Sequence, residues 1–225
     1  MHYSGNNSSH FEQKFVQNLI SVDAYTASYY DPSQTNIIFW IPWIDFNSIQ
    51  FESVTDDFTL NSYIGNYYNL NWLPKSTQCF NIIMNNCVRD FPNTVFNSFP
   101  KPNQNQYSHM AHDEVLFMMN RSCATIHIKE TEGFGYTIIE SIAKGRPVFL
   151  KRSFSLGSRL MNWCIEGKTA FFFDDYNEFH SKLQKYLSDQ EYRHHVQRDC
   201  AATIRKLIDN EKQARILDNF LRNLK

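Results

Sequence analysis

The chain has 225 residues, of which 42% are hydrophobic and 16% aromatic, and its formal net charge at pH 7 is −1. This composition is typical of a folded globular protein and excludes a disordered chain. Without a net positive charge the chain has no global field that attracts nucleic acid. Its apolar runs are all too short for a membrane span, and its polar start predicts no secretory signal.

The five cysteines are scattered along the sequence, and none stands in a pair or beside histidines at the spacing of a metal site. An odd number of cysteines without such spacing is typical of a reduced protein. We therefore expect a cytoplasmic protein without a disulfide framework and without a bound metal.

Residues 1–34 carry few strong patterns and are expected to form an irregular N-terminal segment with a short helix at 11–19. A domain over 35–225 should follow, and its pattern is clearest from about residue 110. The first strand is expected at 37–41, where an apolar, β-branched run ends at a proline. Between 42 and 79 the sequence is aromatic and rich in asparagine, and it predicts no clear element.

The remaining elements alternate between strands and helices. Strands are expected at 80–84, 94–97, 124–128, 147–150 and 169–173, because these runs are apolar and rich in β-branched or aromatic residues. Helical spacing predicts helices over 110–121 and 178–187, and a third after Asp189, which should cap it. This alternation indicates an α/β fold with a doubly wound, mainly parallel sheet.

One stretch carries most of the functional signal. The strand expected at 124–128 is followed by Glu132-Gly133-Phe134-Gly135-Tyr136-Thr137-Ile138-Ile139-Glu140. The two glycines predict a turn, and an apolar segment with helical periodicity then runs to Gly145, a suitable C-terminal stop. The start of such a helix has unpaired N–H groups and a positive dipole, so it can bind an anion such as a diphosphate.

The two glutamates of this stretch extend the hypothesis from an anion to a nucleotide sugar. Eight helical residues rise roughly 12 Å through a little over two turns, so Glu132 and Glu140 would project to a similar side. Carboxylates accept hydrogen bonds from sugar hydroxyls, so one could hold a sugar and the other a ribose, with the diphosphate between them. A plainer interpretation stays open, in which Glu132 only complements the helix dipole and Glu140 is a solvated residue.

The stretch EGFGYTIIESIAKGRPV resembles the E-x7-E signature of retaining GT-B glycosyltransferases of the glycosyl transferases group 1 type, in their C-terminal, donor-binding domain. The likeness continues through 165–175 and the helix pair at 178–193, and it covers about residues 110 to 208. It implies a single Rossmann-like half of the GT-B type. The implied reaction transfers a sugar from a UDP- or GDP-sugar to a hydroxyl acceptor, keeps the anomeric configuration and needs no metal or other cofactor.

The resemblance also implies a role for each residue of the motif. Glu132 is expected to be the catalytic residue that orients the donor sugar, and Glu140 is expected to hold the ribose. The binding segment between them is expected to hold the departing diphosphate through backbone amides, and it comprises Gly133, Phe134, Gly135, Tyr136 and Thr137. His127, within the expected strand, is interpreted as a hydrogen-bonded core histidine.

The sequence departs from the resembled pattern at the diphosphate. The family's Arg and Lys pair, which follows a glycine, has no counterpart here, since Gly65-Asn66 is followed only by Lys75 at a different spacing. Five other cations are candidate substitutes, each with the alternative of being a solvated surface charge: Arg89, Lys129, Lys144, Lys151 and Arg152.

The chain is also too short for two Rossmann-like domains of ordinary size. Either it is a donor half that works with a partner, or residues 1 to about 105 form a reduced replacement for the second domain. Three hypotheses therefore stay open. The chain is a glycosyltransferase that works with a partner domain or as a homodimer, a non-catalytic nucleotide-sugar-binding subunit that completes a partner chain, or a structural module that has kept only the fold.

Overall fold

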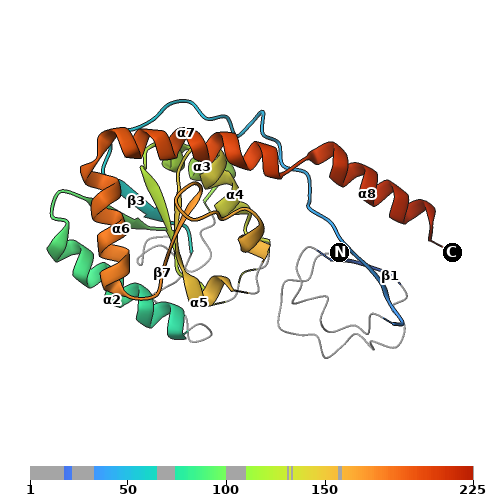
Figure 1. Ribbon diagram of the computed structural model, residues 1–225, viewed down its shortest axis with the longest axis horizontal. Helices are drawn as coiled ribbons and strands as arrows, with labels where there is room; N and C mark the ends of the chain where they lie inside the picture. Colours follow the sequence, from blue (N-terminus) through green and yellow to red (C-terminus); the bar gives the residue numbers. More distant parts are fainter. Residues whose placement is uncertain are drawn as a thin grey trace.

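A five-stranded parallel sheet forms the centre of the computed structural model (Figure 1). The structure describes residues 18–21, 33–64, 74–99, 110–130, 132, 134–156 and 159–224. The strands of this sheet are β3 (Thr59–Ser62), β4 (Val95–Ser98), β5 (Ala124–His127), β6 (Val148–Lys151) and β7 (Ala170–Phe173). They lie in the order β4-β3-β5-β6-β7, and all four pairings are parallel.

This strand order fixes where a ligand is expected. The chain moves outward from β3 to β4 and then returns past β3 to β5, so the winding direction reverses between β3 and β5. Doubly wound sheets bind ligands at the carboxyl ends of the strands, next to such a reversal. The carboxyl ends of β3 and β5 are therefore the first place to look for a site.

Helices cover both faces of the sheet. The crossovers contain α2 (Pro74–Asp90), α3 (His112–Asn120), α4 (Tyr136–Ala143), the short α5 (Arg152–Ser155) and the 3-10 helix η3 (Arg159–Asn162). After β7 come α6 (Tyr176–Ser188), α7 (Gln190–Leu207) and α8 (Asn210–Arg222). α2 packs against α6, whereas α3 packs against α4, as expected for right-handed crossovers that run in opposite directions along the sheet, from β3 to β4 and from β4 to β5. α7 contacts both α4 and α6.

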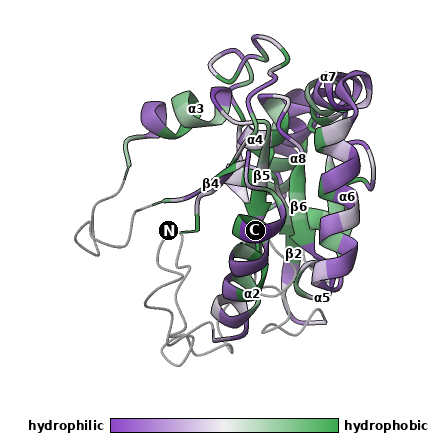
Figure 2. Cartoon of the chain, turned by 90° about the vertical axis from the view of Figure 1, so that its left-hand side faces the viewer, coloured by the Kyte–Doolittle hydropathy of each residue, from purple (hydrophilic) through white to green (hydrophobic). Residues whose placement is uncertain are grey.

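The core lies between these layers and is strongly aromatic. All residues of β5 and β7 are buried, which is the near-continuous apolar pattern of a parallel sheet covered on both sides. The ring of Phe149 lies 4.9 Å from that of Phe171 and 5.4 Å from that of Phe179. Figure 2 shows these apolar strands between helices whose outer faces are polar.

Several predicted elements are confirmed. The strands expected at 94–97, 124–128, 147–150 and 169–173 are β4 to β7, within a residue or so at each end. The helices expected over 110–121, 136–145 and 178–187 are α3, α4 and α6. Asp189 caps α7 by accepting a hydrogen bond from the N–H of Tyr192 at 2.9 Å. Gly145 ends α4 with a φ of +77°.

Two predictions about secondary structure are wrong. The strand expected at 80–84 lies inside α2, because Ser76, Phe80, Ile83 and Cys87 form one buried helical face. The last two residues of the helix expected at 11–19, Asn18 and Leu19, belong instead to strand β1 (Asn18–Ser21), and residues 11–17 lie outside the described part of the chain. The strand expected at 37–41 is β2 (Asn36–Phe39), but it pairs in parallel with β1 and not with the main sheet. The domain boundary at residue 34 stays a prediction.

Residues 41–57 cross over the C-terminal helices without regular structure, and we name them the N-terminal strap. Side chains of α7 and α8 form hydrogen bonds with the backbone N–H and C=O groups of the strap, which have no partners within a helix or sheet. The N–H of Ile41 donates to Oε1 of Gln213 at 3.0 Å, and the N–H of Thr55 donates to Oε1 of Gln197 at 2.8 Å. Asp56 accepts from Arg193 at 2.7 Å.

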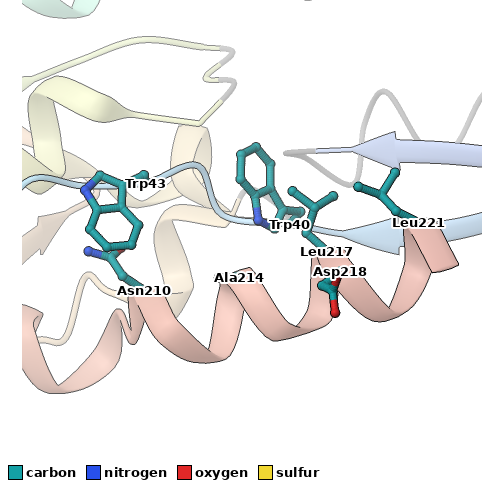
Figure 3. A pocket seen from close by; sticks show the side chains of 7 residues that line it. All are labelled: Trp40, Trp43, Asn210, Ala214, Leu217, Asp218 and Leu221. Carbon is teal, nitrogen blue, oxygen red and sulfur yellow. The ribbon is translucent and has the colours of Figure 1, made fainter.

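A shallow apolar groove lies between the start of the strap and α8 (Figure 3). It is lined by Trp40, Trp43, Asn210, Ala214, Leu217, Asp218 and Leu221. Its lining includes one carboxylate and no cation, so the groove is unsuited to a diphosphate. None of the helices in the described ranges combines the length and the apolarity that crossing a bilayer requires.

Candidate functional site

The connection from β5 to α4 forms the candidate site, at the carboxyl edge of the sheet. Gly135 is the N-cap of α4 and has a left-handed backbone with a φ of +78°. A Cβ at this position would lie 2.7 Å from Cδ2 of Leu160, so both the backbone and the space favour glycine. Two buried hydroxyls then fix α4 on the sheet. Thr125 Oγ1 lies 2.7 Å from Ser141 Oγ, and the Ser141 hydroxyl donates to the carbonyl of Arg146 at 2.9 Å.

The N-terminus of α4 is open to an anion. The N–H groups of Ile138 and Ile139 both donate to the carbonyl of Gly135, which leaves those of Tyr136 and Thr137 directed out of the helix end. No side chain caps this end, and the first turn has no acidic residue. Each of the other described helices with eight or more residues has a carboxylate at its N-terminus: Glu130 at α2, Glu114 at α3, Asp175 at α6, Asp189 at α7 and Asp209 at α8. α4 is thus the one positive helix end available to a ligand in this part of the chain.

Glu132 lies immediately before this helix end. Its Cγ is 3.6 Å from the place where a Cβ of Gly135 would be. Its Oε2 lies 2.8 Å from Nε2 of His127 and 3.3 Å from Nζ of Lys129, and only 11% of its side chain is exposed. His127 is itself buried at the end of β5. The predicted core histidine therefore contacts the carboxylate of the motif, which makes it part of the site.

The surroundings of Glu132 favour its charged form. Burial raises the pKa of a carboxyl group, but here the contacts with His127 and Lys129 outweigh burial and lower the pKa of Glu132 to about 2. The site thus holds a fixed negative charge beside a positive helix end. An ionised carboxylate of this kind can stabilise positive charge that develops on a bound substrate.

Glu140 lies one turn into α4 and is also buried. Its Oε1 is 2.8 Å from Nε2 of His112, the first residue of α3. Burial raises the pKa of Glu140, and the hydrogen bond with His112 offsets this only in part. Glu140 is therefore not a solvated surface residue. The N-termini of α3 and α4 meet at the same edge of the sheet, so this pair lies on the ligand side of the fold.

The structure places the other motif residues as follows. The ring of Phe134 is buried and packs 4.6 Å from the ring of Tyr136 and 5.5 Å from that of Trp163, so only its backbone can serve a ligand. Thr137 follows Tyr136 in the first turn of α4. Gly133 lies outside the described residues.

Arg146 from the GRPV part of the motif has a structural place. Its guanidinium is buried and donates to the carbonyls of Met119 and Asn120 at 3.0 and 3.1 Å, at the C-terminal end of α3. It also reaches the carbonyl of Ser53 in the N-terminal strap at 3.3 Å. A cation at a helix C-terminus stabilises the carbonyl end of the dipole. Arg146 therefore joins three parts of the fold and does not contact the site.

Sequence reasoning missed a contact that fixes the site loop. The N–H of Glu130 donates to Oγ of Ser76 at 2.8 Å, and Oε2 of Glu130 accepts from the N–H of Ser76 at 2.9 Å. These residues are 54 positions apart, so no local pattern links them. Among the described residues, no three His, Cys, Asp or Glu side chains gather in the manner of a metal site.

Comparison with known proteins finds similar folds among solved structures. No family model and no curated protein matches the chain. Sucrose-phosphate synthase from Thermosynechococcus elongatus superposes with a TM-score of 0.67 at 12% identity, over 93% of this chain and 59% of that one. Anabaena HepE in complex with UDP gives 0.59 at 14% identity, over 96% of this chain and 69% of that one.

An isolated domain matches as well. The C-terminal domain of a glycosyl transferase group 1 family protein (LpcC) from Francisella tularensis has a TM-score of 0.51 at 11% identity, over 73% of this chain and 97% of the domain. At these identities the likeness is one of fold. The predicted Rossmann-like α/β fold of a GT-B half is confirmed. This chain spans 59% of the length of the synthase.

Proposed function

We propose that this chain binds a nucleotide sugar at the N-terminus of α4 and is the donor-binding half of a retaining glycosyltransferase. The donor is a UDP- or GDP-sugar, and the acceptor is a hydroxyl group. One observation carries the proposal. Glu132 is a buried carboxylate whose charged form is favoured, beside a helix end that no other side chain caps.

Each group of the site has a chemical task in this reaction. The bond between the anomeric carbon and the diphosphate breaks, and its electron pair leaves with the diphosphate. Negative charge then grows where the amides of Tyr136 and Thr137 point, while positive charge grows on the sugar ring beside Glu132. The acceptor oxygen bonds to the anomeric carbon on the same face, and its proton passes to the departing diphosphate. The catalytic assignment of Glu132 rests on this match of charges.

Glu140 and His112 would form the nucleoside end of the same site. A carboxylate accepts two hydrogen bonds from the hydroxyls of a ribose, and these can replace the contact that Glu140 makes with His112. The segment from Gly133 to Thr137 would bind the diphosphate between the two glutamates. We expect no metal or other cofactor in this scheme, because helix dipole and amides supply the positive field.

Transfer also needs a wall that faces the donor, excludes water and holds the acceptor. A chain that spans 59% of sucrose-phosphate synthase has room for one such half. We propose that the facing wall comes from a partner domain or from a second copy of the chain. One neighbour, the GtfA/B structure, is described as a complex.

We also propose that the protein is cytoplasmic, because its five cysteines are free thiols, as in proteins of a reducing compartment.

Titration calorimetry tests the proposal on the purified chain. UDP or GDP should bind with a clear preference over AMP and inorganic phosphate. Glu132→Gln should keep this binding, with Glu191→Gln on the exposed first turn of α7 as the control. Transfer or donor hydrolysis with UDP- and GDP-sugar panels then separates an enzyme from a non-catalytic subunit. A chain that binds neither nucleoside diphosphate contradicts the proposal.

A further inference from the structure

Five cations were candidates from the sequence for the role of a diphosphate partner, and the structure separates them by position. Arg89 is in the last turn of α2 and pairs with Asp90 at 2.6 Å, at the opposite edge of the sheet from the site. Lys144 follows α4 at that same far edge and pairs with Glu52. α2 and α4 both run from the edge with the site to the opposite edge, so cations at their C-terminal ends lie away from the site.

The next two candidates lie at the correct edge but are engaged elsewhere. Lys151, at the end of β6, donates to the carbonyl of Asp174. Arg152 pairs with Asp174 at 2.9 Å and with Glu178 at 3.1 Å. Asp174 follows β7 and Glu178 is in the first turn of α6, so both lie beyond β6 and away from the reversal between β3 and β5.

Lys129 is the remaining candidate, and it lies in the site. It is two residues past the end of β5, its side chain is 25% exposed, and its Nζ is 3.3 Å from Oε2 of Glu132. The Cγ of Glu132 lies 3.6 Å from the place where a Cβ on Gly135, the N-cap of α4, would be. Lys129 is therefore connected to the N-terminus of α4 through the side chain of Glu132.

The backbone that carries Lys129 is fixed on its C-terminal side. Glu130, the next residue, makes hydrogen bonds in both directions with Ser76 at the start of α2, where Ser76 is fully buried. The same contact places the Glu130 carboxylate on the N-terminus of α2. Of the two helix ends beside the reversal, α2 is thus occupied from within the chain, and an incoming anion is directed to α4.

We propose that Lys129 binds the diphosphate of the donor. This inference rests on the proposed function of the site. A diphosphate next to Glu132 brings two anions together, and their repulsion must be offset by a positive charge between them. An ammonium group has three N–H donors, so Lys129 can hold Glu132 and a phosphate oxygen together.

The same residue would then serve two stages of the reaction. In the ground state Lys129 offsets the repulsion between donor and Glu132. As the bond to the sugar breaks, the diphosphate gains negative charge and its contact with the ammonium strengthens. Lys129 is in this sense a substrate-contacting residue, and its charge acts on the leaving group.

Binding of UDP, UMP and uridine to three lysine variants tests the inference. Lys129→Met should bind UDP about 10–100-fold more weakly, UMP somewhat more weakly, and uridine as tightly as the wild type, whereas Lys129→Arg should restore much of the UDP affinity. The salt dependence of UDP binding should also become shallower in Lys129→Met, because one charged contact is lost. Lys206→Met, in the exposed last turn of α7, is the matched control and should change nothing.

Other results count against the inference. Equal losses for UDP and uridine would show that Lys129 acts only by shaping the fold, and unchanged UDP affinity would show that it does not meet the diphosphate. Lys129→Gln serves as the second variant if the methionine variant does not fold. If the wild-type chain binds no nucleoside diphosphate, the proposed function fails as well, whereas wild-type binding with an unaffected Lys129→Met overturns this inference alone.

Discussion

Glu132 and Glu140 are equally buried, with 11% of each side chain exposed, yet their pKa values move in opposite directions. Burial raises both pKa values. Two partners, His127 and Lys129, overcome this effect at Glu132, and the single partner His112 does not overcome it at Glu140. Paired carboxyl groups whose environments separate their pKa values are a mark of acid–base or charge-stabilising sites. The difference predicts opposite stability changes when each glutamate is neutralised.

Glu140→Gln should stabilise the fold at neutral pH and weaken nucleotide binding. A carboxyl whose folded pKa is raised contributes stability that is fully present below its unfolded value of about 4.5 and is lost as the pH rises through the folded pKa. Glutamine avoids that loss, so the melting temperature at pH 7 should rise by a few degrees, where about 1 kcal/mol corresponds to roughly 2–4 °C. The gain should vanish below pH 4.5, and UDP or GDP binding should weaken by about 1–3 kcal/mol. An unchanged affinity would remove Glu140 from the nucleoside end.

Glu132→Gln should instead destabilise the fold at neutral pH and leave nucleotide binding unchanged. Its folded pKa of about 2 lies below the unfolded value of 4.5, so its contribution to stability is present above pH 4.5 and is lost as the pH falls toward 2. The variant should lose up to roughly 3 kcal/mol at pH 7, and the deficit should shrink between pH 4.5 and 2. Urea denaturation at several pH values measures this. Nucleotide affinity should be kept and most turnover lost, and an equal loss of both would refute the separate roles of the two glutamates.

Gly135→Ala should damage both stability and binding, and Gly167→Ala provides a matched control. Both glycines have positive φ values, +78° and +73°, so alanine costs about 1–2 kcal/mol of backbone strain at either place. Only at Gly135 would the new Cβ also meet Leu160, whereas nothing lies within 4 Å at Gly167. We expect the larger drop in melting temperature for Gly135→Ala, and reduced UDP binding for that variant alone. Similar binding by both variants would argue against the helix end as the anion site.

Arg146→Met should destabilise the fold by about 3–5 kcal/mol, because it removes the buried guanidinium that donates hydrogen bonds to the carbonyls of Met119, Asn120 and Ser53. Arg89→Met removes an exposed guanidinium and should leave the stability nearly unchanged. Chemical denaturation compares the two. At temperatures where Arg146→Met is folded, its UDP affinity should equal that of the wild type, and a specific loss would make Arg146 part of the site.

Local patterns were enough to predict most of the sheet, because its buried strands are continuous apolar runs. The strand β3 was not predicted, because two of its buried residues, Asn61 and Ser62, are polar. Asn61 is tolerated in the core because it donates to the carbonyl of Met118 at 2.9 Å and accepts from Asn97 at 3.1 Å, partners that only the folded chain brings near. Residues 80–84 of α2 were predicted as a strand because Ile82, exposed on the outer side of the helix, makes four of these five residues apolar.

The candidate site was predictable to the extent that it is local. The turn, the helix start and the two glutamates all lie within one short stretch. The pairing of Glu140 with His112 and of Glu130 with Ser76 joins residues 28 and 54 positions apart, and the sequence has no periodicity that links them. Lys129 was one candidate cation among five until the winding of the sheet assigned the others to different places.

The N-terminal strap has a consequence for the synthesis of this protein on the ribosome. Its hydrogen bonds to α7 and α8 join residues between 134 and 172 positions apart. At ordinary rates of translation the strap emerges roughly 10–30 s before its partners exist. During that time Ile41, Ile44 and Ile49, which are buried in the finished fold, have no native surface to cover them. The nascent chain should therefore be a client of chaperones that shield apolar segments, and the last helices to be made should complete the domain.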